Sequence, residues 1–238
     1  MVICFFLLAC ESADRIPVRE LDPPATLPKS YTVQKGDTLY SIAWRFNLDF
    51  KRLAANNGIA PPYAIKPGDK IRLVEPVPAK KSAPVPSKVV KKSGNPPEKG
   101  VKTTAVSVVE KPIAVGGTWR WPLNGKIIRH FSPKDNLSKG IDIQAVEGDP
   151  VVSTRAGTVV YAGSQLKGYG NLIIIRHDDE FLSAYAHNRE ILVKEGQGVG
   201  QGERIAEAGS TGTQSPRLHF EIRQWGKPVD PLQLLIKK

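Results

Sequence analysis

The chain has 238 residues, of which 40% are hydrophobic, and this is enough for one or two modest packed domains joined by linkers. Its formal net charge of +11 suits an anionic partner such as a nucleic acid, a membrane surface or an acidic cell wall. The sequence has no RNP-type aromatic motif, helix-turn-helix signal or zinc finger, so we expect no nucleic acid partner.

Residues 1–10 predict a lipoprotein signal segment. The apolar run at 2–9 is far shorter than the ~20 residues that span a bilayer, but it has the length of a signal-peptide core. Its end, Leu7-Leu8-Ala9-Cys10, resembles the lipobox of bacterial lipoproteins, which implies lipidation at Cys10 and a lipid anchor in a membrane. No Lys or Arg precedes the run, which leaves open a true start further upstream or an apolar terminus without signal function.

The polar, proline-bearing residues 11–29 predict a tether, and residues 30–75 predict a compact α+β module. Asp37 or Thr38 is suited to cap a first helix, and Gly58 suits the left-handed conformation that follows many helix ends. We expect a strand, two helices and a closing strand in the order βααβ, at residues 31–33, 39–46, 50–56 and 70–73.

This block resembles the LysM module. The matching residues are Tyr31, Val33, Gly36, Asp37, Thr38, Leu39, Ile42, Ala43, Leu53, Asn56, Ile65, Pro67, Gly68 and Leu73. LysM modules bind polymers of N-acetylglucosamine, including peptidoglycan. The resemblance implies that glycan strands lie in a shallow groove between two loops, formed by Gly36, Asp37, Thr38 and Leu39 and by Ala64, Ile65 and Lys66. Leu39, Ile42 and Phe46 also suit a hydrophobic core, and Asn56 also suits a structural turn.

Residues 76–117 combine prolines with an excess of lysines, which predicts a disordered basic linker. Residues 118–234 are β-rich and show no long helical period. We expect a mainly-β domain with strands in the runs 126–131, 158–162, 171–176, 181–187 and 218–223.

Two short motifs in this second domain resemble the metal-binding signatures of LytM (lysostaphin-like) zinc peptidases. That family reads His-x-Gly-x-Asp and His-x-His, whereas this chain has Ser138-Lys139-Gly140-Ile141-Asp142 and Arg217-Leu218-His219. The resemblance implies a twisted antiparallel sheet with a groove along one face. Its metal positions are Ser138, Asp142 and His219, and its catalytic histidine positions are His187 and Arg217.

The substitutions predict that the metal site is vestigial. A serine hydroxyl is a poor substitute for an imidazole in a zinc site. Arg217 lies two residues before His219 and so on the same face of a strand, where it adds a positive charge and is unable to act as a base. We therefore expect no cofactor and no catalytic residues, unless His130 supplies an imidazole; His130 and His177 also suit ordinary structural roles.

The lipobox, the LysM-like block, the basic linker and the altered LytM-like domain together resemble the NlpD-type lipoproteins. This resemblance implies a non-catalytic activator of periplasmic N-acetylmuramoyl-L-alanine amidases in septal peptidoglycan splitting, held at the outer membrane and facing the periplasm. The amidase is expected to contact a groove lined by Lys139, Asp142, His187, Arg217 and His219. The alternatives are a zinc-dependent LytM endopeptidase and a passive peptidoglycan-binding lipoprotein.

Overall fold

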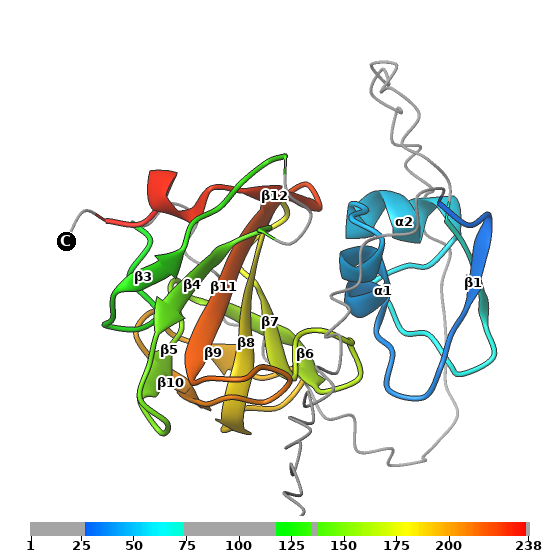
Figure 1. Ribbon diagram of the computed structural model, residues 1–238. Helices are drawn as coiled ribbons and strands as arrows, with labels where there is room; N and C mark the ends of the chain where they lie inside the picture. The colour runs from blue at the N-terminus through cyan, green and yellow to red at the C-terminus, as the bar shows by residue number, and fades with distance from the viewer. Residues whose placement is uncertain (1–26, 74–117, 135–137, 237–238) are drawn as a thin grey trace, which may run out of the picture.

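The computed structural model describes residues 27–73, 118–134 and 138–236 (Figure 1). Cys10, most of the expected tether and the expected linker at 76–117 lie outside these residues. Within the described ranges, no helix has both the length and the apolar character needed to cross a bilayer.

The N-terminal module has the expected order of strand, helix, helix and strand. Its elements are β1 (Ser30–Thr32), α1 (Leu39–Arg45), α2 (Phe50–Asn56) and β2 (Lys70–Arg72), and the two strands pair antiparallel. Thr38 caps α1: its Oγ1 accepts a hydrogen bond from Ser41 N at 3.0 Å, and Thr38 N donates to Ser41 Oγ at 3.0 Å. Gly58 follows α2 with a φ of +67°, the left-handed conformation expected of it.

The C-terminal domain is built on one large antiparallel sheet, which confirms the mainly-β expectation. Along its main path the strands follow the order β3-β4-β11-β8-β7-β6-β9, and β5, β10 and β12 extend it from this path. The strands are β3 (Ile127–Arg129), β4 (Ile141–Gln144), β5 (Pro150–Val152), β6 (Gly157–Gly163), β7 (Asn171–Arg176), β8 (Phe181–Ile191), β9 (Gly198–Val199), β10 (Arg204–Ala208), β11 (Arg217–Gln224) and β12 (Lys227–Val229), followed by a 3-10 helix at Pro231–Gln233.

Some of these strands have no clear signal in the sequence. β8 continues to Ile191, beyond the expected end at residue 187, although Asn188, Arg189 and Glu190 are polar. These residues remain in the sheet because β10 pairs with this part of β8, with Ala208 opposite Asn188 and Glu207 opposite Glu190. The short strands β5, β9 and β10 also depend on pairing with distant segments, which a local pattern does not report.

The central strands bury side chains on both faces. On one face, Leu218, Phe220 and Ile222 of β11 join a core that is formed entirely by the C-terminal domain, which we call the second core. On the other face, Leu172, Ile174, Leu182, Ala184 and Ala186 of β7 and β8 belong to a cluster that also contains the core of the N-terminal module. We call this cluster the shared core, because residues of both modules build it.

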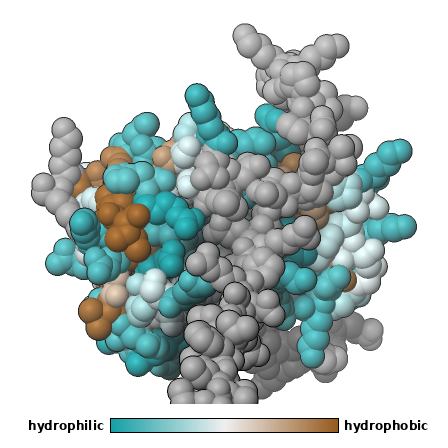
Figure 2. All heavy atoms as spheres, in the orientation of Figure 1, coloured by the Kyte–Doolittle hydropathy of each residue, from teal (hydrophilic) through white to brown (hydrophobic). Residues whose placement is uncertain are grey.

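The two modules therefore lie side by side, as Figure 1 shows, with α1 and α2 on the side of the N-terminal module that is drawn toward the sheet. At one margin of the contact, Gly226 lies against the backbone of Leu48 and Asp49. A Cβ on Gly226 would lie only 2.6 Å from Asp49 N. At another, Lys51 Nζ lies 2.5 Å from Asp179 Oδ2. On the face drawn in Figure 2, hydrophobic residues form small patches among mainly hydrophilic ones.

Candidate functional site

Strand β11 carries four polar residues on one face, namely Arg217, His219, Glu221 and Arg223. They alternate with the apolar residues of the second core, because successive side chains of a strand point to opposite sides. We call the sheet face that they share the signature face. On β8, the residues opposite the last three are the small or apolar Ala186, Ala184 and Leu182, so the polar groups of β11 depend on one another and on β4 for partners.

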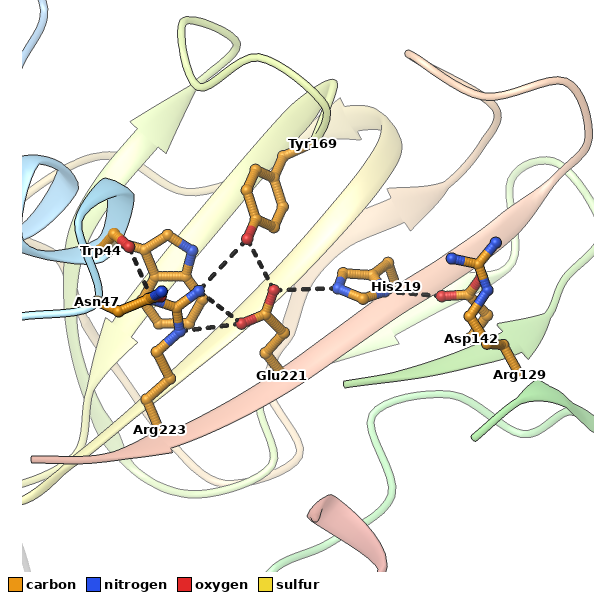
Figure 3. A network of polar contacts seen from close by, with 8 residues as sticks. All are labelled: Trp44, Asn47, Arg129, Asp142, Tyr169, His219, Glu221 and Arg223. Carbon is orange, nitrogen blue, oxygen red and sulfur yellow. Dashed lines mark hydrogen bonds and ion pairs between the residues drawn. The ribbon is translucent and has the colours of Figure 1, made fainter. Parts of the chain in front are cut away.

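His219 is held between two carboxylates, as Figure 3 shows. Its Nδ1 lies 2.7 Å from Asp142 Oδ1 on β4, and its Nε2 lies 3.1 Å from Glu221 Oε1. Carboxylate oxygens accept hydrogen bonds, so this geometry favours an imidazolium that donates from both nitrogens. Burial alone would lower the pKa of His219, but the hydrogen bonds to Asp142 and Glu221 outweigh it and raise the pKa to about 9.

Asp142 is surrounded by positive groups. Arg217 Nη1 donates to Asp142 Oδ2 at 3.1 Å, and Arg129 Nε of β3 lies 3.4 Å from the same oxygen. Burial of this carboxyl would raise its pKa, but the hydrogen bond and charge of His219 and the charge of Arg129 lower it to about 2. Asp142 is therefore ionised throughout the neutral range, and both of its oxygens are engaged.

Glu221 links His219 to the N-terminal module. Its Oε1 accepts a hydrogen bond from Tyr169 Oη at 2.8 Å, and its Oε2 accepts bonds from Arg223 Nε at 2.9 Å and Nη2 at 2.8 Å. Although full burial would raise the pKa of Glu221, the charge of Arg223 and the hydrogen bond from His219 hold it well below its usual range. Arg223 Nη1 in turn donates to the backbone oxygen of Trp44, at the C-terminal end of α1, at 2.7 Å.

His187, the other expected histidine of the site, is placed close to His219 but is neutral. It has a φ of +65°, and its ring centroid lies 6.1 Å from that of His219. Its Nδ1 lies 2.9 Å from Thr211 O and donates to this carbonyl. Burial, together with the charge of His219, lowers the pKa of His187 to about 4.

These residues do not fit a zinc ion. A metal ligand needs a free lone pair, yet both nitrogens of His219 face carboxylates, and both oxygens of Asp142 accept hydrogen bonds or contact cations. Arg217 is also fixed beside Asp142, where its charge would repel a metal. Within residues 27–73, 118–134 and 138–236, no group of three or more His, Cys, Asp or Glu side chains is arranged to hold a metal ion.

The other residues that the sequence singled out in this domain are Ser138, Lys139, His130 and His177. Ser138 is buried, and its backbone oxygen accepts a hydrogen bond from Ser132 N at 2.9 Å. Lys139 is half-buried and lies between Ser138 and the start of β4. His130 is exposed directly after β3, and His177 is buried with its Nε2 2.7 Å from Ser183 Oγ. These contacts agree with the structural role that the sequence suggests for His177.

The expected glycan-binding residues of the N-terminal module lie in two loops and differ in exposure. Gly36, Ala64 and Lys66 are exposed, and Leu39 is buried in the shared core. Asp37 is committed to its own module, because its Oδ2 accepts hydrogen bonds from Tyr31 Oη at 2.7 Å and Gln34 N at 2.9 Å. Thr38 is the cap of α1, and Ile65 is partly buried against the shared core.

The sequence motifs give no role to Glu221, Arg223, Tyr169 or Trp44. Glu221 and Arg223 continue the spacing of two residues that begins at Arg217 and His219, so the strand period places all four on one face. That period was the available signal for Glu221 and Arg223. Tyr169 and Trp44 come from a distant turn and from the other module, and only the tertiary structure brings them to Glu221 and Arg223.

Comparison with known proteins gives two family matches, to the LysM domain over residues 31–74 and to peptidase family M23 over residues 136–231. The chain is 44% identical to "Lipoprotein NlpD/LppB homolog" of Pseudomonas aeruginosa over 270 aligned residues, which cover all of this chain and 90% of that protein. It is 43% identical to "Uncharacterized lipoprotein YgeR" of Escherichia coli, covering 86% of this chain and 80% of that protein. It is 40% identical to "Murein hydrolase activator NlpD" of Escherichia coli, covering 87% and 67%. With a LysM domain, an M23 domain and these identities over most of its length, this protein belongs to the NlpD family.

Proposed function

We propose that this protein activates periplasmic N-acetylmuramoyl-L-alanine amidases during septal peptidoglycan splitting and breaks no bond itself. The observation that carries this proposal is the set of ion pairs among Arg217, Asp142, His219 and Glu221, because it engages two residues, Asp142 and His219, that the LytM resemblance assigns to a metal. Relatives that are 40% and 38% identical bear the name murein hydrolase activator, which supports activation of a hydrolase rather than hydrolysis.

The end of the signature face near Arg217 is our proposed contact surface for the amidase. Its members are Lys139, Asp142, His187, Arg217 and His219. The Arg217 side chain is 18% exposed, and its Nη2 donates to Ser215 Oγ at 3.2 Å at the protein surface. A guanidinium at such an edge is suited to bind a carboxylate of a partner with two parallel hydrogen bonds.

The LysM domain and Cys10 supply the proposed location. LysM would hold the protein on glycan strands through the loops that contain Gly36, Asp37 and Thr38 and Ala64, Ile65 and Lys66, and acylation of Cys10 would anchor it in the outer membrane at the division septum. The lipoprotein names of several relatives, including "Outer membrane antigenic lipoprotein B" of Histophilus somni, support this location.

Release of dye from labelled sacculi tests the function. The purified chain is incubated with sacculi alone, with a purified periplasmic amidase, and with the amidase after Arg217→Ala or Lys139→Ala substitution. We expect release only when the chain and the amidase are together, and less release with the variants. Release by the chain alone would support a zinc endopeptidase, and an unchanged amidase rate would support a passive wall-binding protein.

A further inference from the structure

The LysM module lies on the same sheet face as the altered metal site. The shared core joins α1 and α2 to the apolar side chains of β7 and β8 that alternate with the second core. Because β8 pairs with β11, this places the module next to Glu221 and Arg223. The module thus covers one end of the signature face, while Arg217 lies at the other end of β11.

Arg223 anchors the module at this position. Its Cζ lies 3.6 Å from the centroid of the Trp44 ring, and its Nη1 also donates a hydrogen bond to Asn47 Oδ1 at 2.9 Å. Arg223 is only 1% exposed. A buried guanidinium needs a full set of acceptors, and Trp44 O and Asn47 Oδ1 of the N-terminal module supply two that the M23 domain does not. The buried position of Arg223 therefore depends on its contacts with the C-terminal end of α1.

The glycan loop of the LysM module takes part in the same contact. Gln165, in the turn after β6, lies directly over Gly36, where a Cβ on Gly36 would collide with its side-chain amide. In the orientation that satisfies both of its amide atoms, Gln165 Nε2 donates to Gly36 O at 3.1 Å and Lys35 O at 3.2 Å. Gln165 of the M23 domain thus occupies the space directly over Gly36, one of the residues to which the LysM resemblance assigns glycan binding.

The contact between the modules is incompletely packed at one margin. A cavity of about 300 Å³ lies between α2 and the β11–β12 turn, lined by Asn47, Leu48, Asp49, Arg52, Leu53, Asn56, Trp225 and Lys227. The ion pair of Lys51 and Asp179 at another margin is solvent-exposed. Contacts between domains of one chain commonly allow the domains to move relative to one another unless the contact is large and hydrophobic throughout.

We propose that the LysM module has two mutually exclusive positions, docked on the signature face through Arg223 or bound to wall glycan. In the docked position Gln165 closes the glycan loop, and the module covers the Arg223 end of the face. A glycan strand binds only the released module and so shifts the population toward release. This inference rests on the proposed function, because release uncovers the Arg223 end of the face, which adjoins the proposed amidase contact surface at the Arg217 end, only where there is glycan to bind.

A reversible cross-link between the modules tests the two positions. The full chain carries Cys4→Ser and Cys10→Ser, so that Lys51→Cys and Asp179→Cys provide the only two thiols. A short bismaleimide with a reducible disulfide spacer locks the docked position, and reduction frees it. We expect an efficient intramolecular cross-link, with none in either single-cysteine variant. Failure of the pair to cross-link overturns the docked position.

Glycan binding is then measured with a pentamer of N-acetylglucosamine by amide chemical shifts. We expect the locked protein to lose binding and the reduced protein to regain it. In the locked protein, Gln165→Ala is expected to restore binding in part, because it clears the space above Gly36. Gln233→Ala, an exposed glutamine in the 3-10 helix, is the matched control and is expected to restore none. Equal binding by the locked and reduced forms overturns the exclusive positions.

Amidase stimulation by the same samples separates this inference from the proposed function. We expect the locked protein to lose stimulation and the reduced protein to recover it. If both forms stimulate equally, the inference is wrong and the proposed function stands. If neither form stimulates, the proposed function is wrong, and the glycan measurement alone decides whether the LysM module alternates between two positions.

Discussion

Arg223 of the M23 domain and Trp44 of the LysM domain form a stacked pair in which the guanidinium also donates to the Trp44 backbone oxygen at 2.7 Å. The same guanidinium neutralises Glu221. One side chain thus stabilises a buried carboxylate within its own domain and holds the neighbouring domain. Changes at Arg223 are expected to affect both the fold and the domain contact.

The substitution Arg223→Met is expected to lower the free energy of unfolding by about 3–5 kcal/mol, because it removes the charge that pairs with buried Glu221. Urea denaturation of the full chain, followed by tryptophan fluorescence, measures this change. Arg204→Met is the matched control: Arg204 pairs with Glu207 but is 50% exposed, so its loss is expected to cost at most about 1 kcal/mol. Equal effects of the two substitutions would contradict the role of Arg223.

Acid is expected to destabilise the protein through His177. Burial lowers the pKa of His177 to about 4, from an ordinary value of 6.5, so the folded state binds this proton less readily than the unfolded state. The neutral ring therefore contributes stability above pH 6.5, and this contribution, on the order of 3 kcal/mol, is lost as the pH falls from 6.5 toward 4.

Melting temperatures between pH 7 and pH 4 measure the effect of His177. His177→Gln removes the titrating group, and the stability of this variant is expected to depend less on pH in that window. Some dependence remains, because burial and the charge of His219 lower the pKa of His187 to about 4 as well. An identical pH profile for the variant and the unchanged protein would show that His177 does not contribute.

His219 is expected to act in the opposite pH direction. Its pKa is raised to about 9, because the hydrogen bonds to Asp142 and Glu221 outweigh the effect of burial. Its stabilising contribution is complete below pH 6.5 and is lost as the pH rises through 9. Histidine ring resonances followed by NMR are expected to show one titration near pH 9, which His219→Gln removes. A midpoint near 6.5 would mean that the imidazolium is not held between the two carboxylates.

Restoring both histidines of the signatures is expected to create zinc affinity. The double substitution Ser138→His and Arg217→His supplies two imidazoles and removes the guanidinium from Asp142. Metal content after dialysis against zinc is expected to be one equivalent for this variant. The unchanged chain and the control Ser138→Ala with Arg217→Ala are expected to retain none, and zinc in the control would show that Arg217 alone excludes the metal.

The sequence predicts local features of the fold well where one or two residues determine them. Thr38 caps α1 and Gly58 follows α2 in a left-handed conformation, and both roles depend on chemistry within a few residues. The departures from the LytM signatures at Ser138 and Arg217 are visible in the same local way. These features need no knowledge of distant parts of the chain.

The network around the site is not local. Nothing near His219 in the sequence shows that Asp142 accepts a hydrogen bond from one of its nitrogens. Nor does the local sequence show that Arg129 also pairs with Asp142, or that Trp44 O accepts a hydrogen bond from Arg223. Each of these pairs joins residues from different elements, and their distances depend on strand register and on the packing of one domain on another. Binary pattern and turn chemistry specify the elements, whereas the partners of buried charges follow from how the elements meet.

The alternation along β11 also restricts how this surface changes during evolution. A shift of one residue in pairing with β8 or β4 would turn Leu218, Phe220 and Ile222 toward the signature face and drive His219, Glu221 and Arg223 into an apolar core. No intermediate register exposes only part of the set. Insertions and deletions are therefore tolerated only in the loops at the two ends of this strand, and the contacts to Asp142 and to Trp44 are inherited as one unit.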